Sequence, residues 1–136
     1  MDFSELTKFA ENYAQAWCSQ KPECVASFFA ENGSLRVNDG ALAVGREAIA
    51  KVAQGFMRDF PDMQVTMDRV TLDPHWSAFH WTLTGTNTGP GGTGKRMRIS
   101  GYEEWQLDRA GLIGSSKGHF DGAEYERQLQ HRADGR

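Results

Sequence analysis

The spacing of apolar residues changes once along the chain, close to Met63. Before that point apolar residues recur every three or four positions, as on one face of an α-helix. After it they alternate with polar residues, as on the two faces of a β-strand. The first half therefore predicts helices and the second half a sheet, which together make an α+β fold.

Three helices are predicted in the first half, over residues 3–20, 22–32 and 45–59. Asp2 and Glu5 have the spacing of a capping box at the start of the first helix. Pro22 suits the first turn of the second helix, and Pro61 prevents the third from extending further. A short strand is expected over 34–38, between the second and third helices.

Four longer strands are predicted in the second half, over residues 63–72, 76–86, 95–107 and 112–120. Turn-rich segments join them, so we expect a strongly curved antiparallel meander. One of these segments, 89–95, has the glycine and lysine spacing of a phosphate-binding loop. Arg96 stands where such a loop needs Ser or Thr, and a strand follows instead of a helix, so we interpret the segment as a hairpin connection.

The strand over 95–107 has the most informative pattern in the chain. One of its faces carries Met97, Ile99, Gly101, Glu103, Trp105 and Leu107. Glu103 is the single carboxylate in this otherwise apolar row. Loss of hydration raises the pKa of a carboxylate, and enzymes use this effect to hold proton donors and general bases. Glu103 is therefore our first catalytic candidate, and its structural alternative is an ionised residue paired with an arginine at the sheet edge.

Other candidates each have a structural alternative. Tyr13 lies on the apolar stripe of the first helix, where a core role is the simpler interpretation. Asp39 lies in an Asn-Asp-Gly turn, which these residues favour for conformational reasons. His119 and Asp121 share strand parity, so they either face one cavity and exchange a proton or form a solvated surface pair.

The aromatic content exceeds what a small interior requires. The chain has four Trp and eight Phe, most of which we expect in the core, and an apolar cavity would account for the surplus. The residues that we assign to such a cavity on this basis are Trp17, Phe56, Phe60 and Trp105.

Length and charge narrow the classes of function. A chain of 136 residues, 39% of them hydrophobic and 24% charged, suits one packed domain, which we place at 1–130, with a polar tail at 131–136. The net charge of -3 and the lack of a basic block argue against nucleic-acid binding. The four His are too scattered for a helical metal motif. No membrane span or signal peptide is seen, so a cytoplasmic location is expected.

The sequence resembles the nuclear transport factor 2-like superfamily and, within it, the SnoaL-like proteins. The resemblance lies in the segments 81–90, 93–96, 101–113, 120–121 and 128–129, and in the order of elements over nearly the whole chain. It implies a cone-shaped barrel, in which a curved antiparallel sheet packs against three N-terminal helices and encloses a pocket. In SnoaL-like polyketide cyclases an aspartate at the end of the last strand acts as acid or base, and Asp121 has the matching position.

Ketosteroid isomerases belong to the same superfamily. Their sites set a tyrosine from the first helix and a buried, protonated carboxylic acid against an aspartate base. Tyr13, Glu103 and Asp39 are similar in placement.

These observations lead to one preferred hypothesis. We expect a cofactor-independent isomerase or cyclase that abstracts a proton next to the carbonyl of a small apolar, polyketide- or steroid-like substrate. Asp121 or Asp39 would be the base, protonated Glu103 and Tyr13 would donate hydrogen bonds to the enolate oxygen, and His80 and His119 would assist. The alternatives are a non-catalytic ligand-binding or dimerisation module and, least favoured, a protein-interaction scaffold. The resemblance also implies a homodimer formed through the outer face of the sheet.

Overall fold

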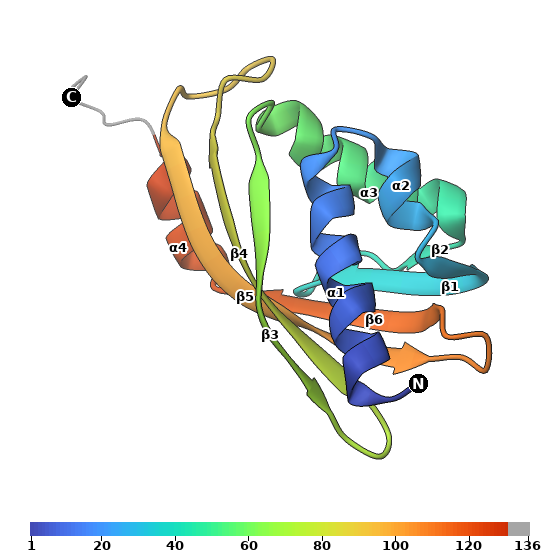
Figure 1. The fold of residues 1–136 in the computed structure, drawn as a ribbon. Helices are drawn as coiled ribbons and strands as arrows, with labels where there is room; N and C mark the ends of the chain where they lie inside the picture. The colour runs from blue at the N-terminus through green and yellow to red at the C-terminus, as the bar shows by residue number, and fades with distance from the viewer. Residues whose placement is uncertain (131–136) are drawn as a thin grey trace.

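The computed structural model describes residues 1–130 and has the expected α+β architecture. Within that range a curved, open sheet of six strands, in the order β2-β1-β6-β5-β4-β3, is accompanied by four helices. Figure 1 shows α1, α2 and α3 gathered on one side of the sheet, with α1 running beside β3. The predicted fold class is confirmed.

Two of the predicted helices form close to their expected bounds. The first is α1 (Phe3–Cys18), and the Asp2–Glu5 capping box is present at its start, with the Glu5 amide donating to Asp2 Oδ1 at 2.8 Å. The other is α3 (Arg46–Asp59). Both bury the apolar stripe that predicted them, including Leu6 on α1 and Ile49 on α3.

The prediction for 22–32 is wrong beyond the first turn. The helix α2 (Pro22–Ala26) is short, and β1 (Phe29–Val37) begins where the helix was expected to continue. The cause is long-range pairing, since the Ile113 amide donates to the Phe28 carbonyl and Phe29 pairs with Ile113. Tertiary contacts of this kind override a weak local helix signal.

The four longer strands match their predicted positions to within one residue at each end. They are β3 (Gln64–Leu72), β4 (Ser77–Thr86), β5 (Arg96–Leu107) and β6 (Ile113–Phe120). They form the expected antiparallel meander. The expectation of a wholly antiparallel sheet needs correction, because β1 pairs parallel with β6 and antiparallel with the short β2 (Ala43–Val44). The glycine-rich segment 89–95 connects β4 to β5, as predicted.

A fourth helix was not predicted. It is α4 (Gly122–Leu129), and it lies against β5 beyond the point where β6 ends. The Gln128 side chain donates to the Arg98 carbonyl at 2.9 Å and accepts from the Arg98 amide at 2.8 Å. These two bonds satisfy backbone groups on a strand edge that would otherwise be open to pairing. The helix therefore covers the free edge of β5.

The polar tail predicted over 131–136 lies outside the described residues. In the described part of the chain, no helix is long and apolar enough to cross a membrane.

Candidate functional site

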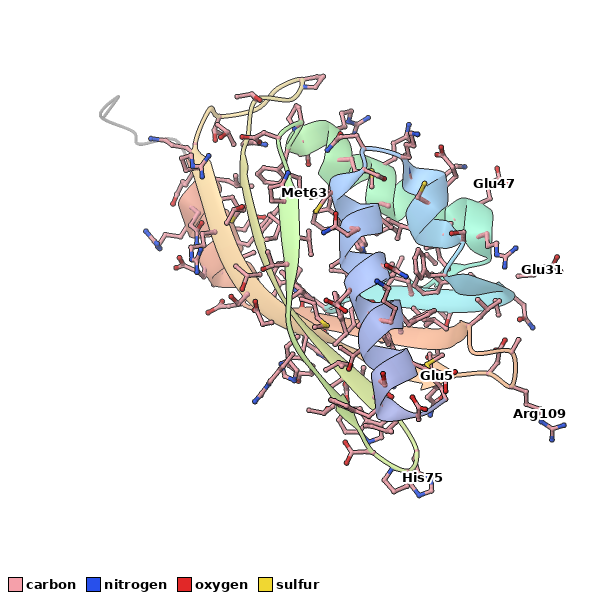
Figure 2. The ribbon with its side chains drawn as sticks, in the orientation of Figure 1. Glu5, Glu31, Glu47, Met63, His75 and Arg109 are labelled. Atoms are coloured by element: carbon pink, nitrogen blue, oxygen red, sulfur yellow. The ribbon has the colours of Figure 1, made fainter. Side chains whose placement is uncertain are left out.

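A cavity of about 60 Å3 lies between the concave face of the sheet and the helices. Its lining is almost entirely apolar and comprises Trp17, Leu35, Val37, Phe56, Val65, Phe79, Trp81, Leu83, Ile99, Glu103, Gly118, Phe120 and Tyr125. By contrast, the exposed side chains Glu31, Glu47 and Arg109 lie at the edge of the molecule in Figure 2 and are not part of the lining. Within residues 1–130, Glu103 is the one carboxylate of the lining.

Glu103 lies at the centre of β5, on the face turned toward the helices. Its neighbours across the sheet are Phe79 on β4 and Gly118 on β6. The side chain is 6% exposed, because the apolar row that alternation predicted packs into the core around it. The strand pattern thus brought a carboxylate into an apolar interior.

Three neutral donors hold the Glu103 carboxylate. Oε1 accepts from Ser116 Oγ at 2.7 Å and from Trp105 Nε1 at 3.0 Å. The Tyr13 hydroxyl reaches both oxygens, at 3.0 Å from Oε1 and 3.1 Å from Oε2. Oε1 is therefore occupied by partners, while Oε2 has the tyrosine alone and retains a free lone pair.

Burial governs the titration of this group. Desolvation raises the pKa of Glu103 above its ordinary value of 4.5, and the hydrogen bonds from Ser116, Trp105 and Tyr13 oppose that shift. Burial and the nearby Glu103 charge hold the pKa of Tyr13 well above 10.0. The tyrosine therefore remains a hydrogen-bond donor over the physiological range, beside a carboxyl group that retains its proton more readily than usual.

Several residues predicted for the site do lie together. Tyr13 and Trp105 bond directly to Glu103, and their rings contact each other at 5.2 Å between centroids. Trp17 and Phe56 line the cavity, as expected. Phe60 is buried next to it and contacts the ring of Tyr125, a lining residue, at 6.3 Å.

The two aspartates lie elsewhere. Asp39 is exposed in the turn after β1. Asp121 is exposed too, and its side chain caps α4 by accepting from the Glu124 amide at 3.1 Å. Neither belongs to the cavity lining, so the structure does not bring an aspartate opposite Glu103.

The two histidines lie on the outer face of the sheet. His80 and His119 stack on either side of Tyr102, with ring centroids 5.5 and 4.7 Å from it. His119 Nε2 also lies 2.6 Å from Glu104 Oε1. Since residues of opposite parity face away from the cavity, this placement does not support the expected role of either histidine at the pocket.

Sequence reasoning missed much of the cavity lining, and three of the missed residues lie beside Glu103 or add a polar group to the site. Ser116 and Gly118 share the inward parity of β6, a signal that was available once the register with β5 was known. Tyr125 comes from the unpredicted helix α4. Burial raises the pKa of its hydroxyl to about 12, so it also stays protonated at the cavity.

A larger depression of about 250 Å3 lies at the turn between β3 and β4, bordered by Asp73, His75 and Arg109. These side chains are exposed, and no buried polar group other than Ser77 lines it among the described residues. In residues 1–130 no three His, Cys, Asp or Glu side chains lie close enough together to hold a metal ion. The cavity at Glu103 is therefore the stronger candidate site.

Solved structures with the same fold come from several bacteria. A protein from Catenulispora acidiphila with a ketosteroid isomerase-like fold, solved with trimethylamine, is 18% identical, with a TM-score of 0.80 over 93% of this chain and 95% of that one. TsrD from Streptomyces laurentii is 18% identical, with a TM-score of 0.81 over 95% and 97%. A phenazine biosynthesis-related protein from Pseudomonas aeruginosa is 19% identical, with a TM-score of 0.71 over 100% and 93%.

At these identities the neighbours establish the fold alone. No curated protein sequence matches the chain. The family model of SnoaL-like polyketide cyclases, however, matches residues 7–129. Because the match spans nearly the whole chain, the protein belongs to the SnoaL-like polyketide cyclase family.

Proposed function

We propose that the protein is a cofactor-independent isomerase or cyclase that transfers a proton next to the carbonyl group of a small apolar substrate, with Glu103 as the proton-transferring residue. The observation that carries this proposal is the placement of one desolvated carboxylate in an apolar cavity. A general base works best when its pKa lies near the working pH, and burial moves the pKa of Glu103 in that direction.

The free lone pair of Oε2 defines the base. In this mechanism Glu103 Oε2 removes a proton from the carbon next to the carbonyl, and the electron pair of the broken C–H bond forms an enolate. Isomerisation follows when Glu103 returns the proton to another carbon of the conjugated enolate. Cyclisation follows when the enolate carbon attacks a second carbonyl and Glu103 returns the proton to the alkoxide oxygen. Both routes restore the carboxylate.

The other polar groups take supporting roles. Tyr13, Trp105 and Ser116 position the carboxylate and stabilise its charged form. Tyr125 supplies a protonated hydroxyl to the cavity, as a donor for the enolate oxygen. This assignment replaces the expected Asp39 or Asp121 with Glu103 as base, because both aspartates lie outside the lining.

The size of the cavity limits the substrate. One water needs about 10–15 Å3 of such a space, so about 60 Å3 holds roughly four to six non-hydrogen atoms. A polyketide- or steroid-like molecule exceeds that volume. In this proposal only its reacting end enters the cavity, or the helix α4 that carries Tyr125 moves aside.

Deuterium exchange tests the proposal without knowledge of the substrate. A small β,γ-unsaturated ketone, 4-penten-2-one, which has six non-hydrogen atoms, is incubated with the protein in D2O, and NMR follows both exchange next to the carbonyl and conversion to the conjugated isomer. We expect the wild type to accelerate exchange and Glu103→Gln to lose about 10²–10⁴-fold of that acceleration. Glu104→Gln, on the outer face, is the matched control and retains it. Equal exchange by the wild type and Glu103→Gln would refute the role of Glu103.

A second candidate function is a binding module without turnover. It is favoured by the small cavity and by the single carboxylate in its described lining, which leaves no second acid to share the proton transfers. A structural neighbour was also solved with trimethylamine. Ligand binding that persists with no deuterium exchange above the uncatalysed rate would support this candidate over the enzyme.

A further inference from the structure

Five aromatic side chains around the cavity form a continuous series of ring contacts. Centroid distances are 6.1 Å from Trp17 to Phe56, 6.4 Å from Phe56 to Tyr125, 5.3 Å from Tyr125 to Phe120, and 6.0 Å from Phe120 to Trp81. All five residues line the cavity, and we call them the aromatic belt. The belt joins α1, α3, α4, β6 and β4.

Neighbouring rings of the belt are steeply inclined to one another. The interplanar angles along the series are 73°, 81°, 54° and 67°. Edge-to-face contacts of this kind place the positive edge of one ring against the negative face of the next. Rings that meet in this way point in several directions around the shared space. A small volume lined by several aromatic side chains is the type of site that recognises quaternary ammonium groups.

The charge at the cavity also favours a positively charged ligand. Glu103 lines the cavity together with the belt, and its three hydrogen-bond partners are neutral. Among residues 1–130, no Lys, Arg or His lines the cavity or forms an ion pair with Glu103. A buried carboxylate is stabilised when a cation joins it, and here the protein supplies none.

We propose that the cavity binds a compact organic ammonium ion, with its positive charge surrounded by the aromatic belt and directed at Glu103. The inference goes beyond the proposed function by assigning a second ligand class to the same cavity, and it rests on that proposal only for the location of the site. A group the size of tetramethylammonium, with five non-hydrogen atoms, suits the roughly four to six atoms that 60 Å3 can hold.

The lining discriminates against other cations. Ca²⁺ requires six to eight oxygen ligands and Mg²⁺ six in near-octahedral geometry. The described lining offers the carboxylate of Glu103 and the hydroxyl of Tyr125 as its side-chain oxygen groups. An organic cation needs no such ligand set, because methyl groups spread its charge over a surface that contacts aromatic rings.

A titration of paired ligands tests the inference. Tetramethylammonium chloride and its neutral counterpart tert-butyl alcohol have the same number of heavy atoms and differ in charge. Binding is followed by NMR chemical shifts of the indole N–H groups and by tryptophan fluorescence, at constant ionic strength. We expect the wild type to bind the cation at least about tenfold more tightly than the alcohol, from the combined carboxylate and cation–π attraction.

Two isosteric variants locate the preference. Glu103→Gln keeps the shape of the side chain and removes its charge, so we expect the preference for the cation to fall by at least about fivefold while the alcohol binds as before. Glu104→Gln, which changes the outer face, should keep the full preference. Trp81→Leu removes one ring of the aromatic belt, and it should lower the affinity for the cation more than the affinity for the alcohol. Binding of the alcohol confirms that each variant is folded.

Failure of this inference is separable from failure of the proposed function. Equal affinity for both ligands in the wild type, or an unchanged preference in Glu103→Gln, would overturn the ammonium site even if Glu103 catalyses deuterium exchange. A clear preference for the cation with no exchange would support the ammonium site and refute the isomerase or cyclase. Loss of both would leave neither proposal standing.

Discussion

Two adjacent glutamates on β5 occupy opposite environments. Glu103 faces the cavity and is held by three neutral donors. Glu104 faces outward, is about one-third exposed, and pairs with His119 at 2.6 Å. The backbone positions are neighbours, so local sequence gives both residues almost the same conformational preference. The strand's alternation alone sends one carboxylate into the core and the other to the surface.

The difference shows what makes a carboxylate chemically useful. Glu104 is partly exposed to solvent and pairs with a histidine, and a surface pair of this kind adds little to stability. Glu103 has lost most of its contact with water, and the aliphatic and phenylalanine side chains that line the cavity with it have no hydrogen-bond donor. Its three donors compensate in part, which leaves a carboxyl group with a raised pKa and one free lone pair. A buried carboxylate can therefore act in proton transfer when its hydrogen bonds replace only part of the water that it has lost.

Substitution of Glu103 and of Glu104 should differ most in the effect on the free energy of unfolding. Glu103→Ala removes the acceptor for Tyr13, Trp105 and Ser116, three groups that are buried. Unsatisfied buried donors cost about 1–3 kcal/mol each, with partial relief by water, so we expect a loss of about 2–5 kcal/mol in the free energy of unfolding. Glu104→Ala should cost less than about 1 kcal/mol. Urea unfolding of both variants measures the difference.

A loss of similar size in both variants would contradict the comparison. Glu103→Gln serves as the control, because its amide oxygen still accepts hydrogen bonds. We expect the free energy of unfolding of this variant to lie between those of the wild type and Glu103→Ala.

The second contrast is in the dependence of stability on pH. Because the pKa of Glu103 is raised in the folded state, the folded chain retains its proton above pH 4.5 while the unfolded chain releases it. Stability from this group is complete below that pH and declines as the pH rises through the folded-state pKa, by at most about 1.4 kcal/mol per pH unit. Thermal or urea unfolding between pH 4 and 8 would record the decline.

His80 makes a comparison with a variant necessary. Burial lowers the pKa of this histidine, which makes stability rise with pH in part of the same range. Glu103→Gln removes only the Glu103 contribution, so the difference between wild type and variant should decline with rising pH. A difference that is flat across the range would mean that the pKa of Glu103 is not raised.

The sequence predicted those elements of the fold that the spacing of apolar residues within one segment determines. Alternation over Gln64–Phe120 placed four strands to within one residue at each end, because a half-buried sheet imposes a period of two. The second helix failed because Phe28 and Phe29 suit a helix or a strand equally, and pairing with β6 decided between them. The fourth helix is short, and Tyr125 and Leu129 are its large apolar residues, so few positions could define the apolar stripe that marks a helix.

Part of the site was predictable, on different grounds for different residues. Glu103 followed from the parity of β5, and Trp17 and Phe56 from the aromatic surplus. The site role of Tyr13 came from the resemblance to ketosteroid isomerases, since its place on the stripe of α1 alone favoured the core. Asp121 was assigned by its position at the end of the last strand, where it instead caps the next helix. Ser116 could not be assigned from the sequence, because its contact with Glu103 depends on the register between β5 and β6.

A smaller effect is expected at Gly118, the neighbour of Glu103 across the sheet. An added Cβ there would contact Glu103 Cγ at 3.8 Å and the Arg36 carbonyl at 3.6 Å, which are ordinary van der Waals distances. Gly118→Ala should therefore fold normally and take space from the cavity. We expect about a tenfold loss of small-ligand affinity, the lower end of the effect of one methylene in an apolar pocket.

Gly55→Ala on α3 is the matched control, since nothing lies within 4 Å of its added Cβ. It should leave ligand affinity unchanged and raise the free energy of unfolding by roughly 0.5–1 kcal/mol, because alanine is the better helix former. Unchanged affinity in Gly118→Ala would mean that ligands do not bind beside Glu103.

The smallest effect concerns the outer face, where we propose a homodimer contact. The stack of His80, Tyr102 and His119 crosses three strands, and Tyr102 is 36% exposed at its centre. Aromatic residues on an exposed sheet face are typical of interfaces. Sedimentation at micromolar concentration should then give twice the chain mass of 15.2 kDa.

Substitution on the two faces of β5 separates this contact from the cavity. Tyr102→Ala removes the central ring of the stack, so we expect weaker self-association with little change in ligand binding. Glu103→Gln alters the cavity and should leave the mass unchanged, since its side chain does not reach the outer face. A wild-type monomer throughout the micromolar range would rule out the dimer. An equal loss of self-association in Tyr102→Ala and Glu103→Gln would mean that a change on the cavity face of β5 alters the dimer contact on its outer face. The two faces of the strand would then not act separately in assembly.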